Sequence, residues 1–433
     1  MPVTLTDLAP LYRRGTPAGI TSVCSAHPSV LRSALRHGRD NGSTVLIEAT
    51  CNQVNHQGGY TGMRPADFAS LVNSLADSEN CPKDLIILGG DHLGPNPWRD
   101  RPAEDALAEA EKMVAEYVAS GFRKIHLDAS MGCAGEPPAL DDAKTADRAA
   151  RLAKVAEDTA KAHNLPLPHY VIGTEVPPPG GADHALSSIE PTSAEAASRT
   201  LEIHGEVFAK HGLTDAFARV IGLVVQPGVE FGNRNVILYE PDKATSLISV
   251  LENHPQFVFE AHSTDYQMTC PLAELVRDGF PILKVGPELT FVMREALYAL
   301  DLIASDLVPG YGDRPLYQAM ESLMLDRPGH WARHYNGDDG ELKLLRHYSL
   351  SDRIRYYWAT EPAQLAVSKL YDTLQGRSVP LPLIWQHLPG AERFAGAALN
   401  PEDVVIWKIT QSLNHYHTAC TRPAKRRSVA AAS

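Results

Sequence analysis

The stretch Leu85-Ile-Ile-Leu-Gly-Gly-Asp-His-Leu-Gly-Pro-Asn96 predicts the fold of this chain. The four apolar residues at its start are typical of a buried strand, and Gly89 and Gly90 are expected to end that strand. Asp91 and His92 follow at its carboxyl end. Later segments repeat this design of a short apolar run with polar groups behind it, which is typical of a parallel (β/α)₈ barrel. An adjacent Asp and His at such a strand end supply a proton acceptor and a metal ligand.

Seven further apolar runs have the length and spacing of barrel strands, and helical patterns separate them. The eight predicted strands are 20–25, 44–50, 85–88, 124–128, 170–175, 220–226, 257–262 and 281–285. Predicted helices include 29–39, 65–77, 103–120, an alanine-rich helix that ends near residue 163, 193–212 and a last barrel helix that opens at 286–288. The fold class is therefore α/β, a TIM barrel with a C-terminal helical extension.

Three regions follow from this pattern. Residues 1–305 are predicted to form the barrel. Residues 306–421 lose the strand pattern and gain aromatic and charged side chains, which predicts helices packed on the barrel. Residues 422–433 are small and basic, and we expect a disordered tail there.

Composition excludes several classes of function. The chain has 433 residues and a net charge of −12, with no long basic stripe before its last residues, which argues against nucleic acid as a partner. A local group of cations can still bind a phosphorylated substrate. No apolar run approaches the ~20 residues that span a bilayer, and no signal peptide is evident, so we expect a cytoplasmic protein without a membrane partner. Six scattered cysteines without a Cys-x-x-Cys pair fit reduced thiols.

The predicted strand ends bring many charged and polar side chains toward one edge of the barrel. They are Glu48, Asp91, His92, His126, Asp128, Glu175, Gln226, His262 and Lys284. So many charges in one place are unfavourable unless they bind a metal or an anion. Because two histidines and one carboxylate form a common catalytic metal set, we predict His92, Glu175 and His262 as ligands of a divalent metal. Zinc is the first choice, with manganese or magnesium as alternatives, and Gln226 is a weak extra ligand or a substrate contact.

The remaining acids and the lysine have competing explanations. Asp91 is the leading candidate for a catalytic acid or base, with Asp128 and Glu48 beside it. Asp128 and Glu48 also have a structural explanation as partners in buried ion pairs. Lys284 is a Schiff-base lysine, a phosphate contact or a structural ion-pair partner.

Candidate substrate-binding residues lie in the loops. Asn52 and Gln53 belong to a long polar loop after the second strand. Gly286 precedes the helix that opens at Pro287, where backbone N–H groups and the positive end of the helix dipole suit a phosphate group. Gly180-Gly181 is a second candidate for the phosphate position. Arg353 and Arg355 in the extension are further cations that can reach this edge, although a solvated helix face explains them equally well. The chain has neither a P-loop nor a dinucleotide fingerprint, which argues against a P-loop kinase and against NAD as a cofactor.

Six motifs resemble one known family. They are Ser22-Val-Cys-Ser-Ala-His-Pro28, Leu46-Ile-Glu-Ala-Thr50, Asn52-Gln-Val-Asn55, Gly58-Gly-Tyr-Thr-Gly-Met63, Gly89-Gly-Asp-His-Leu-Gly-Pro-Asn96 and Lys124-Ile-His-Leu-Asp-Ala-Ser130. The chain resembles the GatZ/KbaZ family, whose members are known as accessory subunits of class II D-tagatose-1,6-bisphosphate aldolase. That family includes sugar-phosphate C4 epimerases and has carried the older label of tagatose-6-phosphate kinase.

The strand ends are more distantly similar to class II aldolases themselves. In that resemblance Asp91 corresponds to the catalytic acid/base, and His92 and His262 correspond to zinc ligands. Glu175 before Gly180-Gly181, and Lys284-Val-Gly-Pro-Glu-Leu289, also match the aldolase pattern. The aldolases carry a further zinc-binding histidine where this chain has Gln226.

Both resemblances imply metal-dependent chemistry at the C3–C4 bond of a phosphorylated ketohexose, within tagatose and galactitol catabolism. The leading hypothesis is a D-tagatose 6-phosphate 4-epimerase. The alternative is a non-catalytic subunit that stabilises a class II aldolase chain, and a tagatose-6-phosphate kinase is third. The expected partners are the sugar phosphate, an aldolase chain in the accessory case, and a second copy of the chain.

Overall fold

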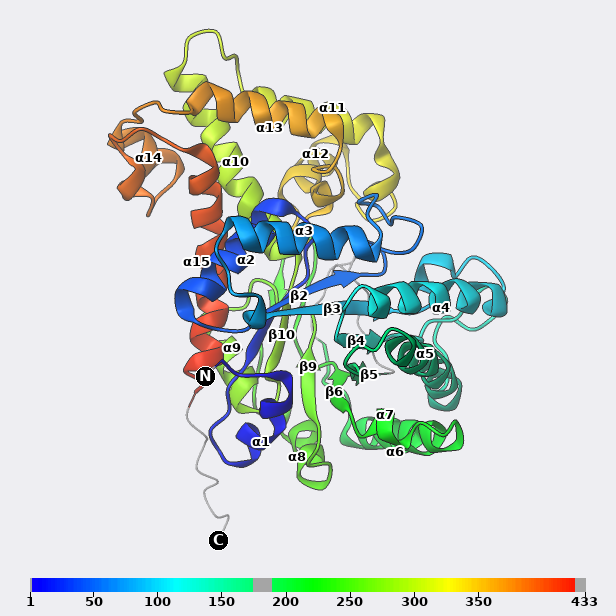
Figure 1. Ribbon diagram of the computed structural model, residues 1–433. Coiled ribbons are helices and arrows are strands. Elements are labelled where there is room, and N and C mark those ends of the chain that lie inside the picture. Colours follow the sequence, from blue (N-terminus) through cyan, green and yellow to red (C-terminus); the bar gives the residue numbers. More distant parts are fainter. Residues whose placement is uncertain (1, 174–188, 425–433) are drawn as a thin grey trace.

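The computed structural model describes residues 2–173 and 189–424, and a closed barrel of eight parallel strands lies at its centre (Figure 1). The strands are β1 (Ile20–Val23), β2 (Val45–Thr50), β3 (Ile86–Leu93), β4 (Lys124–Leu127), β5 (His169–Ile172), β6 (Val220–Val225), β9 (Val258–Ala261) and β10 (Ile282–Val285). Their order around the barrel is β1-β10-β9-β6-β5-β4-β3-β2. Each predicted strand has a counterpart here, so the TIM barrel is confirmed.

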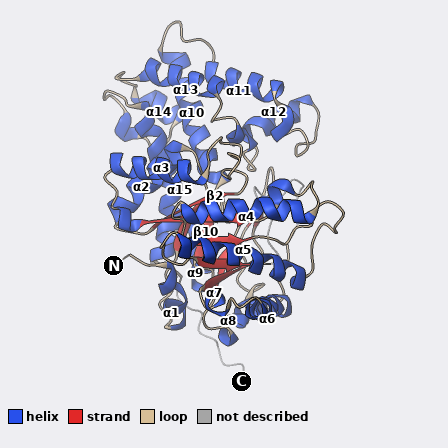
Figure 2. Cartoon of the chain, turned by 45° about the vertical axis from the view of Figure 1, so that its right-hand side comes forward, coloured by secondary structure: helices blue, strands red, loops and turns tan. Residues whose placement is uncertain are grey.

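Helices surround the strands on the outside of the barrel (Figure 2). They are α2 (Pro28–Asn41), α3 (Pro65–Ser78), α4 (Ala103–Ala119), α5 (Asp142–Ala162), α6 (Ala194–Lys210), α8 (Thr245–Asn253), α9 (Thr269–Arg277) and α10 (Pro287–Leu307). Short elements in the connections are η2 (Lys83–Leu85), η3 (Asn96–Trp98), α7 (Thr214–Phe217) and the hairpin β7 (Glu230–Phe231) with β8 (Val236–Ile237). None of the helices in the described residues has the length and apolarity needed to cross a membrane.

The strand β3 is longer than the sequence predicts. We expected Gly89 and Gly90 to end it, and this prediction is wrong, because β3 pairs with its neighbours through both glycines. The glycines are needed for close packing. A Cβ atom on Gly89 would lie 2.8 Å from the side chain of Glu48, and one on Gly90 would lie 2.5 Å from Leu93.

The amino-terminal end of the barrel is filled with apolar side chains. Ahead of β1 lie η1 (Leu5–Asp7) and α1 (Leu8–Arg13). Leu5 and Leu8 of these turns are buried in one cluster with residues at the strand starts, such as Ile20 and Ile282. Apolar packing therefore fills this end of the barrel, and the opposite end is available for a binding site.

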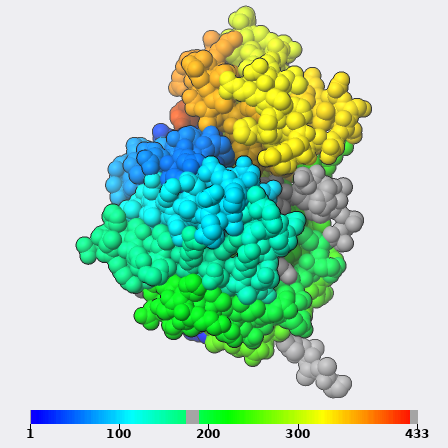
Figure 3. Space-filling model, turned by 90° about the vertical axis from the view of Figure 1, so that its right-hand side faces the viewer, coloured from blue at the N-terminus to red at the C-terminus, as the bar shows by residue number. Residues whose placement is uncertain are grey.

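The helical extension sits on the carboxyl end of the strands, where Figure 3 shows it in yellow and orange above the blue-to-green barrel. It contains α11 (Pro315–Asp326), η4 (Pro328–His330), α12 (Asp339–Tyr348), η5 (Arg353–Tyr356), α13 (Glu361–Leu374), α14 (Leu381–His387) and η6 (Glu392–Phe394). The helix α10 rises from the barrel into this layer (Figure 1).

The last helix, α15 (Pro401–Thr421), returns to the barrel and packs against β1, α2, α9 and α10. The hydroxyl of Tyr416 donates a hydrogen bond of 2.8 Å to the carbonyl oxygen of Thr264, just after β9. Ser412 donates a hydrogen bond of 2.5 Å to Glu288 in the first turn of α10. The C-terminal helix therefore completes the outer ring and holds the strand ends beneath the extension.

Candidate active site

A bulge in β3 aims two neighbouring side chains into the barrel. Successive residues of a regular strand point to opposite faces, so Asp91 and His92 would normally separate. The register between β3 and β4 shifts between Gly90 and Leu93, and His92 has a φ of 51°. A left-handed residue of this kind costs about 1–3 kcal/mol and persists mainly at functional sites.

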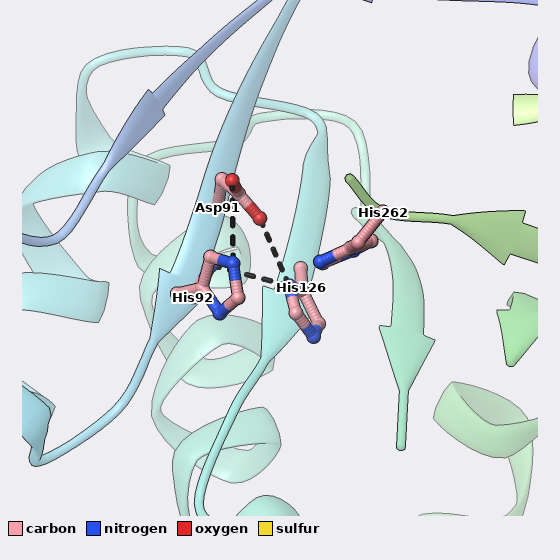
Figure 4. A group of neighbouring side chains, drawn as sticks. All are labelled: Asp91, His92, His126 and His262. Atoms are coloured by element: carbon pink, nitrogen blue, oxygen red, sulfur yellow. Dashed lines mark hydrogen bonds and ion pairs between the residues drawn. The ribbon is translucent and has the colours of Figure 1, made fainter. Parts of the chain in front are cut away.

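Three imidazoles and one carboxylate meet at this point (Figure 4). The rings of His92, His126 and His262 form a triangle with centre-to-centre distances of 4.9, 5.0 and 5.2 Å. Together with Asp91 they each offer one ligand atom, and these atoms all lie within 4.8 Å of one another. His92 and Asp91 come from β3, His126 from β4, and His262 follows β9.

Neighbouring carboxylates orient two of the rings. His92 Nδ1 lies 2.8 Å from Asp128 Oδ2, and the hydroxyl of Ser130 donates a 2.9 Å hydrogen bond to the other oxygen of Asp128. His262 Nε2 lies 2.9 Å from Glu260 Oε1. Each ring therefore keeps its second nitrogen for a ligand, an arrangement typical of metal-binding histidines.

The protonation states of two of the three rings, His126 and His262, suit metal binding. Burial, and then the Lys284 ammonium group, lowers the pKa of His262 to about 3, so its ring is neutral at pH 7. Burial also lowers the pKa of His126. His126 Nδ1 lies 3.0 Å from Asp91 Oδ1, and its Nε2 is buried with no hydrogen-bond partner among the described residues. Neutral imidazoles with free nitrogens are the ligands that zinc and related divalent metals prefer.

The donor set of the described residues is therefore compatible with a divalent metal, and it differs from the predicted one. His126 joins His92 and His262, whereas Glu175 lies outside the described residues. The strand alternation placed His126 on the same face as Asp128, so the sequence carried a signal for it. We predicted a carboxylate, that of Glu175, as the third metal ligand, and no local sequence pattern favours either Glu175 or His126.

A buried ion network lies beneath the imidazoles. Lys124 Nζ donates hydrogen bonds of 2.7 and 3.0 Å to the two carboxylate oxygens of Glu48, and lies 2.7 Å from Glu260 Oε2. Lys124, Glu48 and Glu260 have no exposed side-chain surface. Glu48, a predicted catalytic residue, is therefore a buried ion-pair partner in this structure.

Lys284 links this network to Asp91. Its ammonium group contacts Asp91 Oδ1 and lies 3.4 Å from Glu260 and 3.6 Å from Glu48. Burial lowers the pKa of Lys284, but these carboxylates outweigh burial and raise the pKa well above its ordinary value. Schiff-base formation needs a neutral amine, so the charged lysine fits an ion-pair role better.

Asp91 is ionised. Burial raises the pKa of its carboxyl group, but His92, Lys284 and the hydrogen bond between Asp91 and His126 outweigh burial and hold the pKa well below its usual range. The carboxylate therefore stays an acceptor at pH 7, and the ammonium of Lys284 holds it in place.

A cavity of about 600 Å³ opens above the cluster, between the strand ends and the extension. Its floor includes Asp91, His92, His262 and Lys284. Its walls come from the loops after β1 and β2, from the start of α10, and from η5 and α13. The volume lies within the usual range for small-molecule sites.

The family model described as D-tagatose-1,6-bisphosphate aldolase subunit GatZ/KbaZ-like matches residues 5–421. This chain belongs to the GatZ/KbaZ-like family.

Two relatives of this GatZ/KbaZ-like protein are informative. A protein of Agrobacterium fabrum (strain C58 / ATCC 33970), named D-tagatose 6-phosphate 4-epimerase, is 59% identical over 419 residues, which cover 97% of this chain and 99% of the relative. A crystal structure from Sinorhizobium meliloti 1021, described as a probable tagatose 6 phosphate kinase, is 49% identical with a TM-score of 0.86. That match covers 93% of this chain and 100% of the other.

The predicted substrate-binding residues of this GatZ/KbaZ-like protein divide into two groups. Asn52, Gln53, Lys284 and Gly286 line the cavity. Gln226 does not, because its side-chain oxygen accepts hydrogen bonds of 2.8 and 2.9 Å from the next turn of backbone, at residues 228 and 229. This interaction explains a glutamine after β6 without a substrate or a metal.

The expected phosphate position at the start of α10 is already filled by a side chain. The N–H groups of Gly286 and Glu288 donate hydrogen bonds of 2.9 and 2.8 Å to Asp265 Oδ1. These two N–H groups are therefore already hydrogen-bonded, and a phosphate group at this helix start stays a prediction. A side chain that caps a helix from a distant loop leaves no mark in the local sequence.

Proposed function

We propose that this chain is a D-tagatose 6-phosphate 4-epimerase, which interconverts D-tagatose 6-phosphate and D-fructose 6-phosphate in tagatose catabolism. The observation that carries the proposal is the buried cluster of Asp91 with three oriented imidazoles at the base of a cavity. The strong similarity to the Agrobacterium protein of that name supports the choice of substrate.

His92, His126 and His262 would hold a divalent metal, and a set of three nitrogen ligands favours zinc. Such an ion supplies Lewis-acid polarisation of the ketose carbonyl group and stabilises enediolate charge. Asp128 and Glu260 keep two of the rings in their binding orientation through the hydrogen bonds described above.

Asp91 is the group that transfers the proton. Its carboxylate accepts the proton of the C4 hydroxyl group, the C3–C4 bond breaks, and the bonding electrons form an enediolate over C2 and C3. C4 becomes an aldehyde carbon. When the aldehyde turns its other face to C3 and the bond forms again, Asp91 returns the proton and the configuration at C4 is inverted. No electrons are gained or lost, so the reaction needs no nicotinamide.

The accessory-subunit alternative explains the strand ends less well. A non-catalytic protein has no need for a left-handed His92 or for buried, oriented imidazoles at the base of a cavity, because each is costly to maintain. We place the enzyme in the cytoplasm, in keeping with its metabolic substrate. A class II aldolase chain and a second copy of this chain are the protein partners to be tested by gel filtration.

The test is conversion of D-tagatose 6-phosphate by the purified chain with added zinc, followed by NMR. We expect D-fructose 6-phosphate to appear, and Asp91→Asn to lower the rate by about 10²-fold or more. The exposed Asp100 provides a control, since Asp100→Asn is expected to keep full activity. No conversion by the wild type, but a gain in activity when an aldolase chain is added, would support the accessory role instead.

A further inference from the structure

We propose that Arg355 of the extension binds the phosphate group of the substrate and makes this layer a specificity element. The inference rests on the proposed function, because it takes as the substrate a ketohexose phosphate whose sugar carbons lie over Asp91. Its evidence comes from the cations that line the cavity and from their partners.

Arg355 is held in the cavity wall by its own surroundings. It belongs to η5, and both it and Tyr356 line the cavity. One nitrogen of its guanidinium group, Nη1, bonds to the backbone oxygens of Ser351 and Asp352. The other, Nη2, lies 2.9 Å from the hydroxyl of Tyr356. These contacts fix the guanidinium group before any ligand arrives, which favours binding.

The loop after β2 meets Arg355 from the barrel side. The ring of Tyr60, a cavity residue of that loop, lies 4.7 Å from the ring of Tyr356 in an edge-on contact. The Tyr60 hydroxyl also interacts with the side chains of Gln53 and Arg355. Arg355 is therefore placed where the extension closes on the barrel, next to the predicted substrate loop.

No carboxylate of the described residues forms an ion pair with Arg355. Among the described residues that line the cavity, the lysines and arginines are Lys284 and Arg355. Lys284 is matched by three carboxylates, as described above. Asp352 exerts an electrostatic effect on Arg355, but its Oδ1 lies 3.6 Å from Nε of Arg294, with which it forms an ion pair. A fixed guanidinium group that faces a cavity without a counter-ion suits a dianion such as a phosphate group.

The alternatives for the phosphate group are weaker. The N–H groups at the start of α10 are occupied by Asp265. Arg353, in the same short helix as Arg355, does not line the cavity and donates to the carbonyl oxygen of His330 at 3.2 Å. Among the described residues that line the cavity, Arg355 is the cation that remains, and Gly180 and Gly181 lie outside the described residues.

The test compares Arg355→Gln and Arg355→Lys with Arg333→Gln, a control that removes an exposed arginine elsewhere in the extension. For Arg355→Gln we expect KM for D-tagatose 6-phosphate to rise about 10- to 100-fold with a smaller change in kcat, and Arg355→Lys to recover part of the loss. Turnover of unphosphorylated D-tagatose should be equally slow in all of these proteins. An unchanged KM in Arg355→Gln overturns the inference, even if the wild type is a good epimerase.

A second measurement needs no turnover. Inorganic phosphate at millimolar concentration is expected to raise the Tm of the wild type and of Arg333→Gln, but not of Arg355→Gln. If the wild type does not epimerise the sugar and this pattern still appears, the proposed function fails while the phosphate site stands. Equal stabilisation of all variants, or of none, overturns the phosphate site.

Discussion

Replacement of Asp128 tests whether the imidazole cluster is built for a metal. Asp128 Oδ2 lies 2.8 Å from His92 Nδ1, and the two side chains are only 6% and 4% exposed. Burial lowers the pKa of His92, but Asp91 and Asp128 outweigh burial and raise it above its ordinary value. The more basic ring is a stronger ligand, so loss of Asp128 should weaken metal binding through His92.

The expected loss of zinc affinity follows from the type of contact between Asp128 and His92. A buried hydrogen bond to a charged group contributes about 1.5–3 kcal/mol, which corresponds to about 10- to 100-fold in affinity. Asp128→Asn keeps an acceptor oxygen and loses only the charge, so we expect a loss of about 10-fold. Asp128→Ala loses both and is expected near 100-fold, the range seen for groups that orient metal-binding histidines.

The assay is a zinc titration of metal-free protein in competition with a coloured chelator. Ser130→Ala removes the 2.9 Å hydrogen bond to Asp128 and should weaken zinc binding by less than Asp128→Asn does. Circular dichroism checks that each variant is folded. If Asp128→Ala is folded and binds zinc as tightly as the wild type, His92 is not a ligand and the reasoning about the cluster is refuted.

Two further predictions concern packing and pH. A Cβ atom on Gly94 would lie 1.6 Å from the carbonyl oxygen of Asp128, so Gly94→Ala should lower the free energy of unfolding by about 3 kcal/mol or more. Gly329 has open space around it, so Gly329→Ala should change this free energy little. Urea melts measure both variants. Burial, and then the carboxylate of Glu288, raises the pKa of Asp265 to about 7, so its contribution to stability is present at low pH and is lost as pH rises through 7. The free-energy difference between wild type and Asp265→Asn should therefore shift by about 2–3 kcal/mol in favour of the variant from pH 5 to pH 8, and a constant difference would contradict this assignment.

The sequence was most informative where local patterns decide the structure. Apolar runs and helical periodicity predicted the eight barrel strands and most of the helices, because the burial of a strand and the amphipathicity of a helix depend on residues that are close together in the sequence. Asp91 and His92 were assigned to one strand end, and the structure places them there. The bulge that turns both inward depends on pairing with β4, which the sequence does not show.

Interactions between distant segments were missed for a physical reason. Gly89 appeared to end a strand, because the side chain of Glu48 that needs the space lies 41 positions earlier in the chain. The cap that Asp265 places on α10 and the return of α15 to the barrel also depend on contacts across the fold. His126 carried a signal in the strand alternation, yet its place beside His92 and His262 became evident only from the three-dimensional triangle of rings. Glu175 lies outside the described residues and stays a prediction.

The most direct test of the central claim is the epimerisation of D-tagatose 6-phosphate in D₂O, with the product analysed by NMR. Cleavage and re-formation of the C3–C4 bond keeps the hydrogen on C4 throughout, so we predict D-fructose 6-phosphate with no deuterium at C4, and a much slower reaction with Asp91→Asn. Deuterium at C4 would show that a C–H bond is broken instead, and the absence of D-fructose 6-phosphate would contradict the epimerase itself.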